Sequence, residues 1–185
     1  KGSPRISEEL FVQRSILASK YTNAKIHFST ITTSESVKLI REAKSKGLNV
    51  SADTSSYHLI LDDSKLESFN SNLKVNPPLR SFKDIKALKD GLKDGTIDAI
   101  CSDHYPQNIE NKKCEFDLAS FGMINLETSF AAANTALKDI LSIEELISTF
   151  TSKPKAILGL KNEAIEEGAL ADLTPVSYTH LRAHE

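Results

Sequence analysis

The chain has 185 residues, of which 39% are hydrophobic and 26% charged, the balance of an ordinary globular protein. Its 23 Lys and Arg against 25 Asp and Glu give a formal net charge of -2, which excludes the basic excess of a nucleic-acid-binding domain. No apolar run reaches the roughly 20 residues of a membrane span, and two cysteines are too few for a disulfide framework. We therefore expect a cytoplasmic protein that binds neither nucleic acid nor membrane.

The spacing of apolar residues predicts helices that alternate with short strands. A serine before an acidic first turn starts the first helix, and a glycine lies just past the end of the second. The predicted elements, in chain order, are a helix capped by Ser7, a strand over 24–29, a helix capped by Ser34, a strand over 48–53, a helix over 82–92, a strand over 97–102, and helices over 123–138 and 143–150.

This order indicates an α/β fold, because crossovers of this length join parallel strands. An α/β barrel and an open doubly wound sheet share the pattern. The chain contains no Gly-x-Gly-x-x-Gly and no Walker loop, which disfavours the nucleotide-binding sheets. A complete barrel needs about 250 residues, so three strands predict part of a barrel.

The last residues differ from the rest. Residues 175–185 (PVSYTHLRAHE) show no continuing periodicity and resemble the translated read-through of a sequencing-library adapter. We therefore take residues 1–174 as the partial barrel domain, which ends in the start of a return to a small β domain, and exclude 175–185 as a non-native tail.

One acidic residue directly follows the last predicted strand. Asp103 lies in the segment SDHYP, and the carboxyl ends of barrel strands face the active site. A carboxylate there can bind a metal or act as a general base. The alternative is an aspartate-capped turn before a proline.

A proline-rich loop presents two further polar residues. In KVNPPLR, two prolines restrict the backbone around Asn76 and Arg80, whose amide and guanidinium suit a substrate with carboxylate and amide groups. The alternative is a structural turn with Arg80 on the surface. His27 and His58 each stand alone in the sequence, and a lone histidine more often packs or hydrogen-bonds than binds a metal.

Taken together, these segments resemble the C-terminal part of a dihydroorotase of the multifunctional-complex type, in the amidohydrolase superfamily. The resemblance runs from residue 1 to about 174 in conserved order and spacing, through the segments 34–47, 74–80 (KVNPPLR), 94–100 (DGTIDAI), 102–106 (SDHYP), 116–122 (FDLASFG) and 167–173 (EGALADL). It implies that the three strands are strands six to eight of a TIM-type (β/α)8 barrel truncated at its N-terminus. The strands that carry the family's His-x-His pair are absent, so we expect the chain alone to be inactive.

The resemblance also implies site residues and a cofactor. One or two zinc ions act in the family, and the strand-eight aspartate, here Asp103, binds metal and shuttles a proton. Asn76 would contact the substrate, N-carbamoyl-L-aspartate or dihydroorotate, and backbone groups near Phe121 and Gly122 would hold its ring.

Three positions depart from the family pattern. The strand-six metal histidine falls on Thr30, a poor zinc ligand. His27 is a weak substitute, because strand alternation places residues three apart on opposite faces. Gln107 stands where the family usually has a histidine for the substrate carboxylate, and it can still donate a hydrogen bond. Asn125 stands where glycine is usual.

Three functions therefore remain open. The first is a dihydroorotase of pyrimidine biosynthesis, homo-oligomeric in its full-length form. The second is a non-catalytic dihydroorotase-like scaffold that binds aspartate transcarbamoylase, which Thr30 and Gln107 favour. The third is a related allantoinase or hydantoinase.

Overall fold

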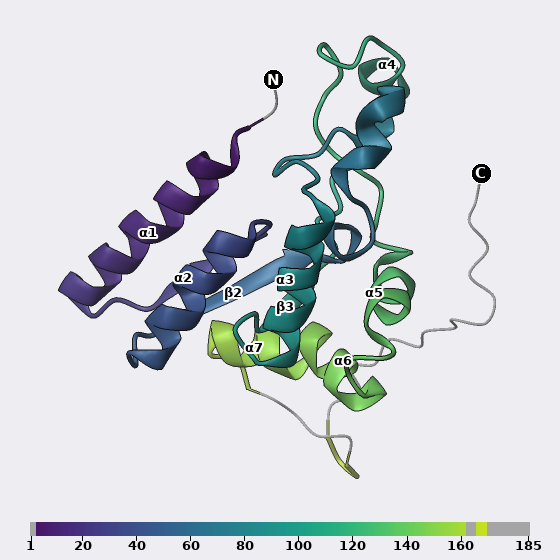
Figure 1. The fold of residues 1–185 in the computed structure, drawn as a ribbon. Coiled ribbons are helices and arrows are strands. Elements are labelled where there is room, and N and C mark those ends of the chain that lie inside the picture. The colour runs from purple at the N-terminus through teal and green to yellow at the C-terminus, as the bar shows by residue number, and fades with distance from the viewer. Residues whose placement is uncertain (1–2, 162–165, 170–185) are drawn as a thin grey trace.

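The computed structural model describes residues 3–161 and 166–169, and the predicted tail over 175–185 lies outside them. Helices outnumber strands, and long helices lie against one side of the sheet (Figure 1). The helices are α1 (Arg5–Thr22), α2 (Ser34–Ser45), α3 (Phe82–Lys93), α4 (Ile109–Lys112), α5 (Ser129–Leu137), α6 (Ile143–Phe150), α7 (Ser152–Leu158) and the 3-10 helices η1 (Ser56–Leu59), η2 (Asp63–Ser68) and η3 (Ser71–Leu73).

Three parallel strands form the sheet, in the order β1 (Ile26–Phe28), β2 (Val50–Ser55), β3 (Ala99–Cys101). The register pairs β1 with the first half of β2 and β3 with its second half. All of β2 is buried, as expected for a central strand. The predicted parallel α/β arrangement is confirmed.

The two faces of the sheet differ in chemistry. Side chains of one face join the main core with residues of the covering helices, among them Phe28, Val50, Ala52, Ile100, Val37, Ile40, Leu88 and Leu92. The other face carries His27, Ser51 and Asp53, which hydrogen-bond to one another. A polar face of this kind needs partners, because buried polar groups are costly when unpaired.

Helix starts are shifted from their predicted positions. The first helix begins at Arg5 with Pro4 as its N-cap, so the prediction of Ser7 as cap is wrong; proline suits the first positions of a helix because it lacks an N–H. Thr33, not Ser34, caps α2 and accepts from the Ser36 N–H at 3.2 Å. In both cases a residue that can start a helix, Pro4 or Thr33, precedes the predicted cap in the chain.

Two later predictions also need correction. The helix predicted over 123–138 begins only at Ser129, because residues before it form a loop bound to the end of β3. Helix α7 was not predicted; its Pro154 lies in the first turn, where proline is tolerated. No helix within the described residues is long and apolar enough to cross a membrane.

Candidate functional site

The backbone turns sharply just past two of the three strands. Thr30, after β1, has φ 53°, and Asp103, after β3, has φ 46°. Residues other than glycine rarely adopt this left-handed region, and a β-branched threonine does so with strain. Such strained positions cluster at functional sites. The carboxyl edge of the sheet is therefore the candidate site.

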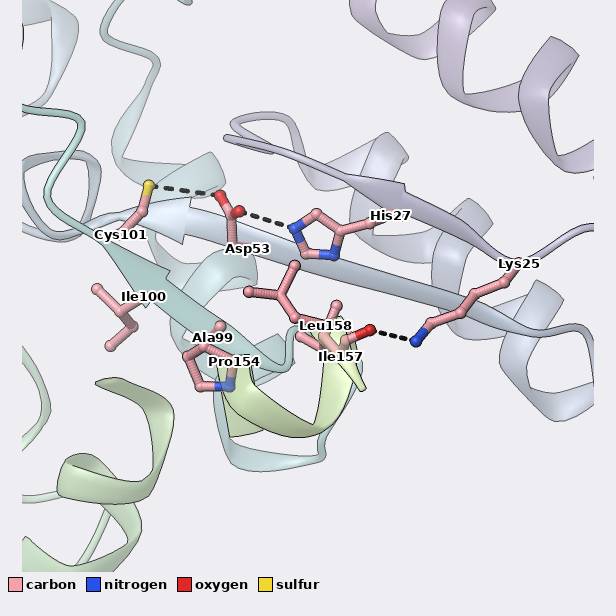
Figure 2. Close-up of a pocket in the computed structure, with 9 residues that line it drawn as sticks. All are labelled: Lys25, His27, Asp53, Ala99, Ile100, Cys101, Pro154, Ile157 and Leu158. Carbon is pink, nitrogen blue, oxygen red and sulfur yellow. Dashed lines mark hydrogen bonds and ion pairs between the residues drawn. The ribbon is translucent and has the colours of Figure 1, made fainter. Parts of the chain in front are cut away.

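Asp53, on β2, holds the three strands together at this edge. Its carboxylate accepts from His27 Nε2 at 2.9 Å, from the Thr30 N–H at 2.7 Å and from the thiol of Cys101 at 3.4 Å. Figure 2 shows it between His27 and Cys101. Burial alone would raise the pKa of Asp53, but the hydrogen bonds from His27 and Thr30 outweigh it and lower the pKa.

The same contacts correct one prediction. His27 and Thr30 were expected on opposite faces of the strand, yet both contact Asp53, and Thr30 Oγ1 lies 3.9 Å from Cys101 Sγ. Strand β1 ends at Phe28, and the positive φ of Thr30 then breaks the alternation of side chains. Both residues therefore belong to one cluster.

Tyr57 binds the carboxylate of Asp103. The tyrosine follows β2 in η1, is 2% exposed, and its hydroxyl donates to Asp103 Oδ2. Burial is the main cause that raises the pKa of Tyr57, and the hydrogen bond to Asp103 adds to it. The phenol therefore stays protonated and acts as a donor. Tyrosine and aspartate thus join the ends of β2 and β3.

His58 fixes the proline-rich loop to the end of β2. Its ring lies 2.7 Å from Ser55 Oγ through Nδ1 and 3.1 Å from Pro77 O through Nε2. Burial lowers the pKa of His58 to about 4, so the ring is neutral and donates from Nε2 to the carbonyl. His58 is a structural residue that positions the loop with Asn76.

A cavity of about 470 Å³ lies beside the end of β1, and its lining includes Thr30, Asn76 and Arg80. Asn76 is exposed, whereas Arg80 is 8% exposed and donates to Thr32 Oγ1 at 3.1 Å and to the Ser3 carbonyl at 2.9 Å. The structure thus brings two predicted substrate residues together with Thr30, the position of the family's strand-six metal histidine, whereas Asp103, the predicted metal ligand, does not line this cavity. Arg80 already has protein partners there.

The remaining predicted residues lie on the loops after β3. Gly122 is fixed from two sides: its N–H donates to the Lys74 carbonyl at 2.9 Å, and its own carbonyl accepts from Lys112 Nζ at 2.9 Å. Phe121 is exposed, with Lys74 Nζ 4.9 Å from its ring centroid. Gln107 is half-buried on the same stretch of chain, and it does not line the cavity beside Thr30.

Asn125 joins the residues that follow β2 and β3. Its side-chain amide is 4% exposed and donates to Ser56 Oγ at 2.7 Å and to the Ser102 carbonyl at 2.6 Å. These bonds explain a side chain where the family usually has glycine.

Asn125→Ala is expected to lower the free energy of unfolding by about 1–3 kcal/mol, because the Ser102 carbonyl and Ser56 hydroxyl lose a buried partner. Urea denaturation of the intact protein measures this. Asn108→Ala is the control, since Asn108 is exposed and its side chain caps nothing; its change should stay within about 0.5 kcal/mol. Equal effects of the two variants would contradict the bridging role.

Comparison with known proteins shows which family the chain belongs to. The model of the amidohydrolase family matches residues 8–184. The chain belongs to the amidohydrolase family. Among curated relatives, a dihydroorotase of Ruminiclostridium cellulolyticum is 45% identical over 175 residues, 94% of this chain and 41% of that protein. A dihydroorotase of Elusimicrobium minutum is 45% identical over 172 residues, 92% of this chain and 40% of that protein. The chain thus spans about 41% of such relatives.

Solved hydantoinase structures share the fold. L-hydantoinase (dihydropyrimidinase) from Arthrobacter aurescens superposes with a TM-score of 0.79 at 28% identity, over 85% of this chain and 36% of that chain. D-hydantoinase from a Thermus species gives a TM-score of 0.77 at 22% identity, over 83% of this chain and 35% of that chain, which shows the fold alone.

Amidohydrolases of this family depend on a metal, so we ask whether the side chains at the strand ends could bind one. Among the described residues, no three His, Cys, Asp or Glu side chains are grouped so that they could hold a metal ion. Thr30 and Tyr57 offer hydroxyls, which are not the nitrogen, sulfur or carboxylate ligands that zinc takes. His27, Asp53 and Cys101 carry suitable atoms but hydrogen-bond to one another. The described strand ends therefore do not by themselves make a zinc centre, and Asp103 is the carboxylate they leave available.

Two central residues of the site were not predicted. Asp53 carried a signal in the sequence, a carboxylate within a strand of otherwise small and apolar residues, since such residues are buried only when paired. Tyr57 carried no comparable signal, because only the fold places its hydroxyl against Asp103.

Proposed function

We propose that the protein is a dihydroorotase, which interconverts dihydroorotate and N-carbamoyl-L-aspartate in pyrimidine biosynthesis. The observation that carries the proposal is the 45% identity to a curated dihydroorotase over 94% of this chain. We further propose that β1 to β3 are neighbouring strands, six to eight, of a (β/α)8 barrel. We also propose that the intact protein is a cytoplasmic homo-oligomer. The free thiols of Cys101 and Cys114 support the cytoplasmic location.

The reaction needs a proton carrier at the amide bond. In ring opening, the oxygen of water bonds to the carbonyl carbon, the C–N bond breaks, and the proton released by water ends on the departing nitrogen. Asp103 is our candidate for carrying this proton, as a carboxylate at a strand end whose Oδ2 accepts from the hydroxyl of Tyr57. Asn76 is the candidate for binding the substrate, with Arg80, Gln107, Phe121 and Gly122 as further candidates around it.

Asp103→Asn is therefore expected to lower kcat by about 10²–10⁴-fold, because an amide cannot accept and return the proton. The measurement is the formation of N-carbamoyl-L-aspartate from dihydroorotate by the intact protein. Asp90→Asn, on the exposed surface of α3, is the matched control and should leave kcat unchanged. An Asp103→Asn protein with full activity would refute the assignment.

A non-catalytic scaffold for aspartate transcarbamoylase is the second candidate. Thr30 and Tyr57 at the strand ends favour it, because neither is a zinc ligand. The sign of a scaffold is an intact protein that opens no dihydroorotate ring but co-elutes with aspartate transcarbamoylase in size-exclusion chromatography. An allantoinase or hydantoinase is the third candidate, and the likeness to L-hydantoinase from Arthrobacter aurescens makes hydantoin the alternative substrate to assay.

A further inference from the structure

Helix α1 carries a row of exposed apolar side chains. Ile6, Leu10, Leu17 and Tyr21 are each more than half exposed in the part of the chain that the structure describes. At about 100° of rotation per residue, the four lie within about 60° of one another around the helix, so they form one continuous row, which we call the α1 stripe. Contiguous exposed apolar patches mark interaction sites, whereas single exposed apolar residues do not.

The α1 stripe lies away from the contacts that hold α1 on the protein. Val12 and Ser19 are the buried residues of the helix, and Ile16 packs against the main core, on the side of α1 that contacts α2 and β1. Figure 1 shows α1 at the outer edge of the molecule, beside α2. The helix is thus apolar on two opposite sides, which is typical of a helix that is buried on both.

The rest of a barrel would join the chain on another side of α1. Strand β1 is an edge strand of the described sheet, so a preceding strand would pair with its free edge. Ser7 and Phe11 line the cavity beside β1 and lie about 70° and 110° around the helix from the middle of the α1 stripe. The α1 stripe is therefore not the side of the helix that faces this edge.

The spacing of the α1 stripe fits a second copy of the same helix. The gaps between its successive members are four, seven and four residues, which is the same from either end. Two copies that lie antiparallel about a two-fold axis beside Gln13 therefore place Ile6 against Tyr21 of the second copy. The same packing places Leu10 against Leu17. A surface that matches itself in this way is the requirement for a two-fold interface.

Charges beside the α1 stripe agree with the antiparallel orientation. Glu9 and Lys20 lie on the same flank, and the antiparallel packing brings Glu9 of each copy within about one helical turn of Lys20 of the other. Such exposed pairs fix orientation more than affinity. On the opposite flank Arg14 would approach its own copy, but its guanidinium carbon lies 5.3 Å from the Phe11 ring centroid, on the side away from the stripe.

We propose that the α1 stripe is an interface between two copies of this chain, which pack their α1 helices antiparallel about a two-fold axis. The inference rests on the homo-oligomer of the proposed function and names its surface. It is independent of the reaction that the protein catalyses.

Analytical ultracentrifugation of the intact protein tests the interface. The double variant Leu10→Glu/Leu17→Glu should sediment at half the wild-type mass, because four like charges would face one another in an apolar contact. Leu118→Glu, which changes an equally exposed leucine on a loop, is the matched control and should keep the wild-type mass. Circular dichroism should be the same for all three proteins. A double variant with the wild-type mass would overturn the proposal.

Cysteine cross-linking tests the antiparallel arrangement. Gln13 lies beside the proposed axis, so Gln13→Cys should form a disulfide with its own copy under mild oxidation. The variant is made together with Cys114→Ser, which removes the exposed native thiol. Lys38→Cys in the same background, on the exposed surface of α2, is the control and should run as a single chain on a non-reducing gel. A Gln13→Cys protein without a cross-linked dimer would contradict the arrangement.

The same measurements separate the other occupants of the α1 stripe. A monomeric wild-type protein overturns both the interface and the homo-oligomer, and a lower melting temperature of the double variant would then assign the stripe to the rest of the chain. A wild-type oligomer whose mass the double variant keeps overturns the interface alone. Loss of co-elution with aspartate transcarbamoylase in that variant would assign the stripe to this partner instead. No outcome depends on ring opening, so the proposed reaction can fail while the interface stands.

Discussion

Replacing Gly122 by alanine is expected to detach the loop after β3 from the end of the sheet. Gly122 has φ 133°, and a Cβ on it would lie 2.2 Å from the Tyr105 carbonyl oxygen and 2.9 Å from Tyr105 Cδ1. The nearer atom belongs to the backbone, so no side-chain rotation relieves the clash. Because Tyr105 follows closely on Asp103, the loop must move as a whole.

We expect the Gly122→Ala change to cost about 3 kcal/mol or more, through a steric clash and a backbone conformation that alanine rarely adopts. The rate of dihydroorotate ring opening should fall at least about a hundredfold, since Gly122 contacts both the loop with Asn76, through Lys74, and the loop with Asp103, through Tyr105. Urea denaturation and the activity assay on the intact protein measure the two effects.

Gly95→Ala is the matched control. Gly95 also has a positive φ, of 77°, but open space surrounds the position of its Cβ, so the change should cost only about 1 kcal/mol with no loss of activity. The difference between the two variants isolates the close approach of the backbones. Variants of equal stability would show that the loop yields easily, and that Gly122 does not fix it.

The sheet could be predicted from the sequence because its signals are local. The strands predicted at 24–29, 48–53 and 97–102 agree with the structure within two residues at every end, since apolar alternation and long crossovers allow few arrangements of the strands. Helix α7 was missed; it has only 7 residues and contains a proline, which the helix tolerates because Pro154 lies in the first turn. The start of α5 was placed too early because the long-range bonds of Asn125 hold the preceding residues in a loop.

The site was predictable only in part. Asp103 and Asn76 follow from a strand end and a proline-rich loop, both visible in the sequence. The expected opposition of His27 and Thr30 was wrong because one left-handed residue reverses the side-chain order. Asp53 and Tyr57 act through contacts with residues 23 and 46 positions away in the chain, which no local pattern encodes.

Asp84 is expected to be the most sensitive charged residue outside the site. It is fully buried at the start of α3 and joins three helices: it accepts from Arg5 of α1, from the Ser34 N–H of α2 at 2.8 Å, and from its own N-cap Ser81 at 2.6 Å. Asp84→Ala should lower the free energy of unfolding by about 2–3 kcal/mol, because it leaves the Ser34 N–H without its acceptor and removes the ion pair with the partly exposed Arg5.

The same residue predicts a dependence of stability on pH. Burial alone would raise the pKa of Asp84, but the hydrogen bonds from Arg5, Ser81 and Ser34 lower it to about 2, below its ordinary value of 3.8. A carboxyl with a lowered folded-state pKa stabilises the fold above its unfolded-state pKa, and this stability is lost as the pH falls through the folded-state value. The contribution, about 2–3 kcal/mol, is therefore complete near pH 6 and disappears between about pH 4 and pH 2.

Urea denaturation of the wild-type protein and Asp84→Asn across this range tests the prediction. The amide cannot titrate, so the stability difference between the two proteins should be largest near pH 6 and should shrink steadily below pH 4. Asp90→Asn, an exposed change on the same helix, should follow the wild-type curve within about 0.5 kcal/mol. A difference that stays constant down to pH 2 would mean that Asp84 acts through packing and hydrogen bonds that the amide also lacks, and that its charge adds nothing.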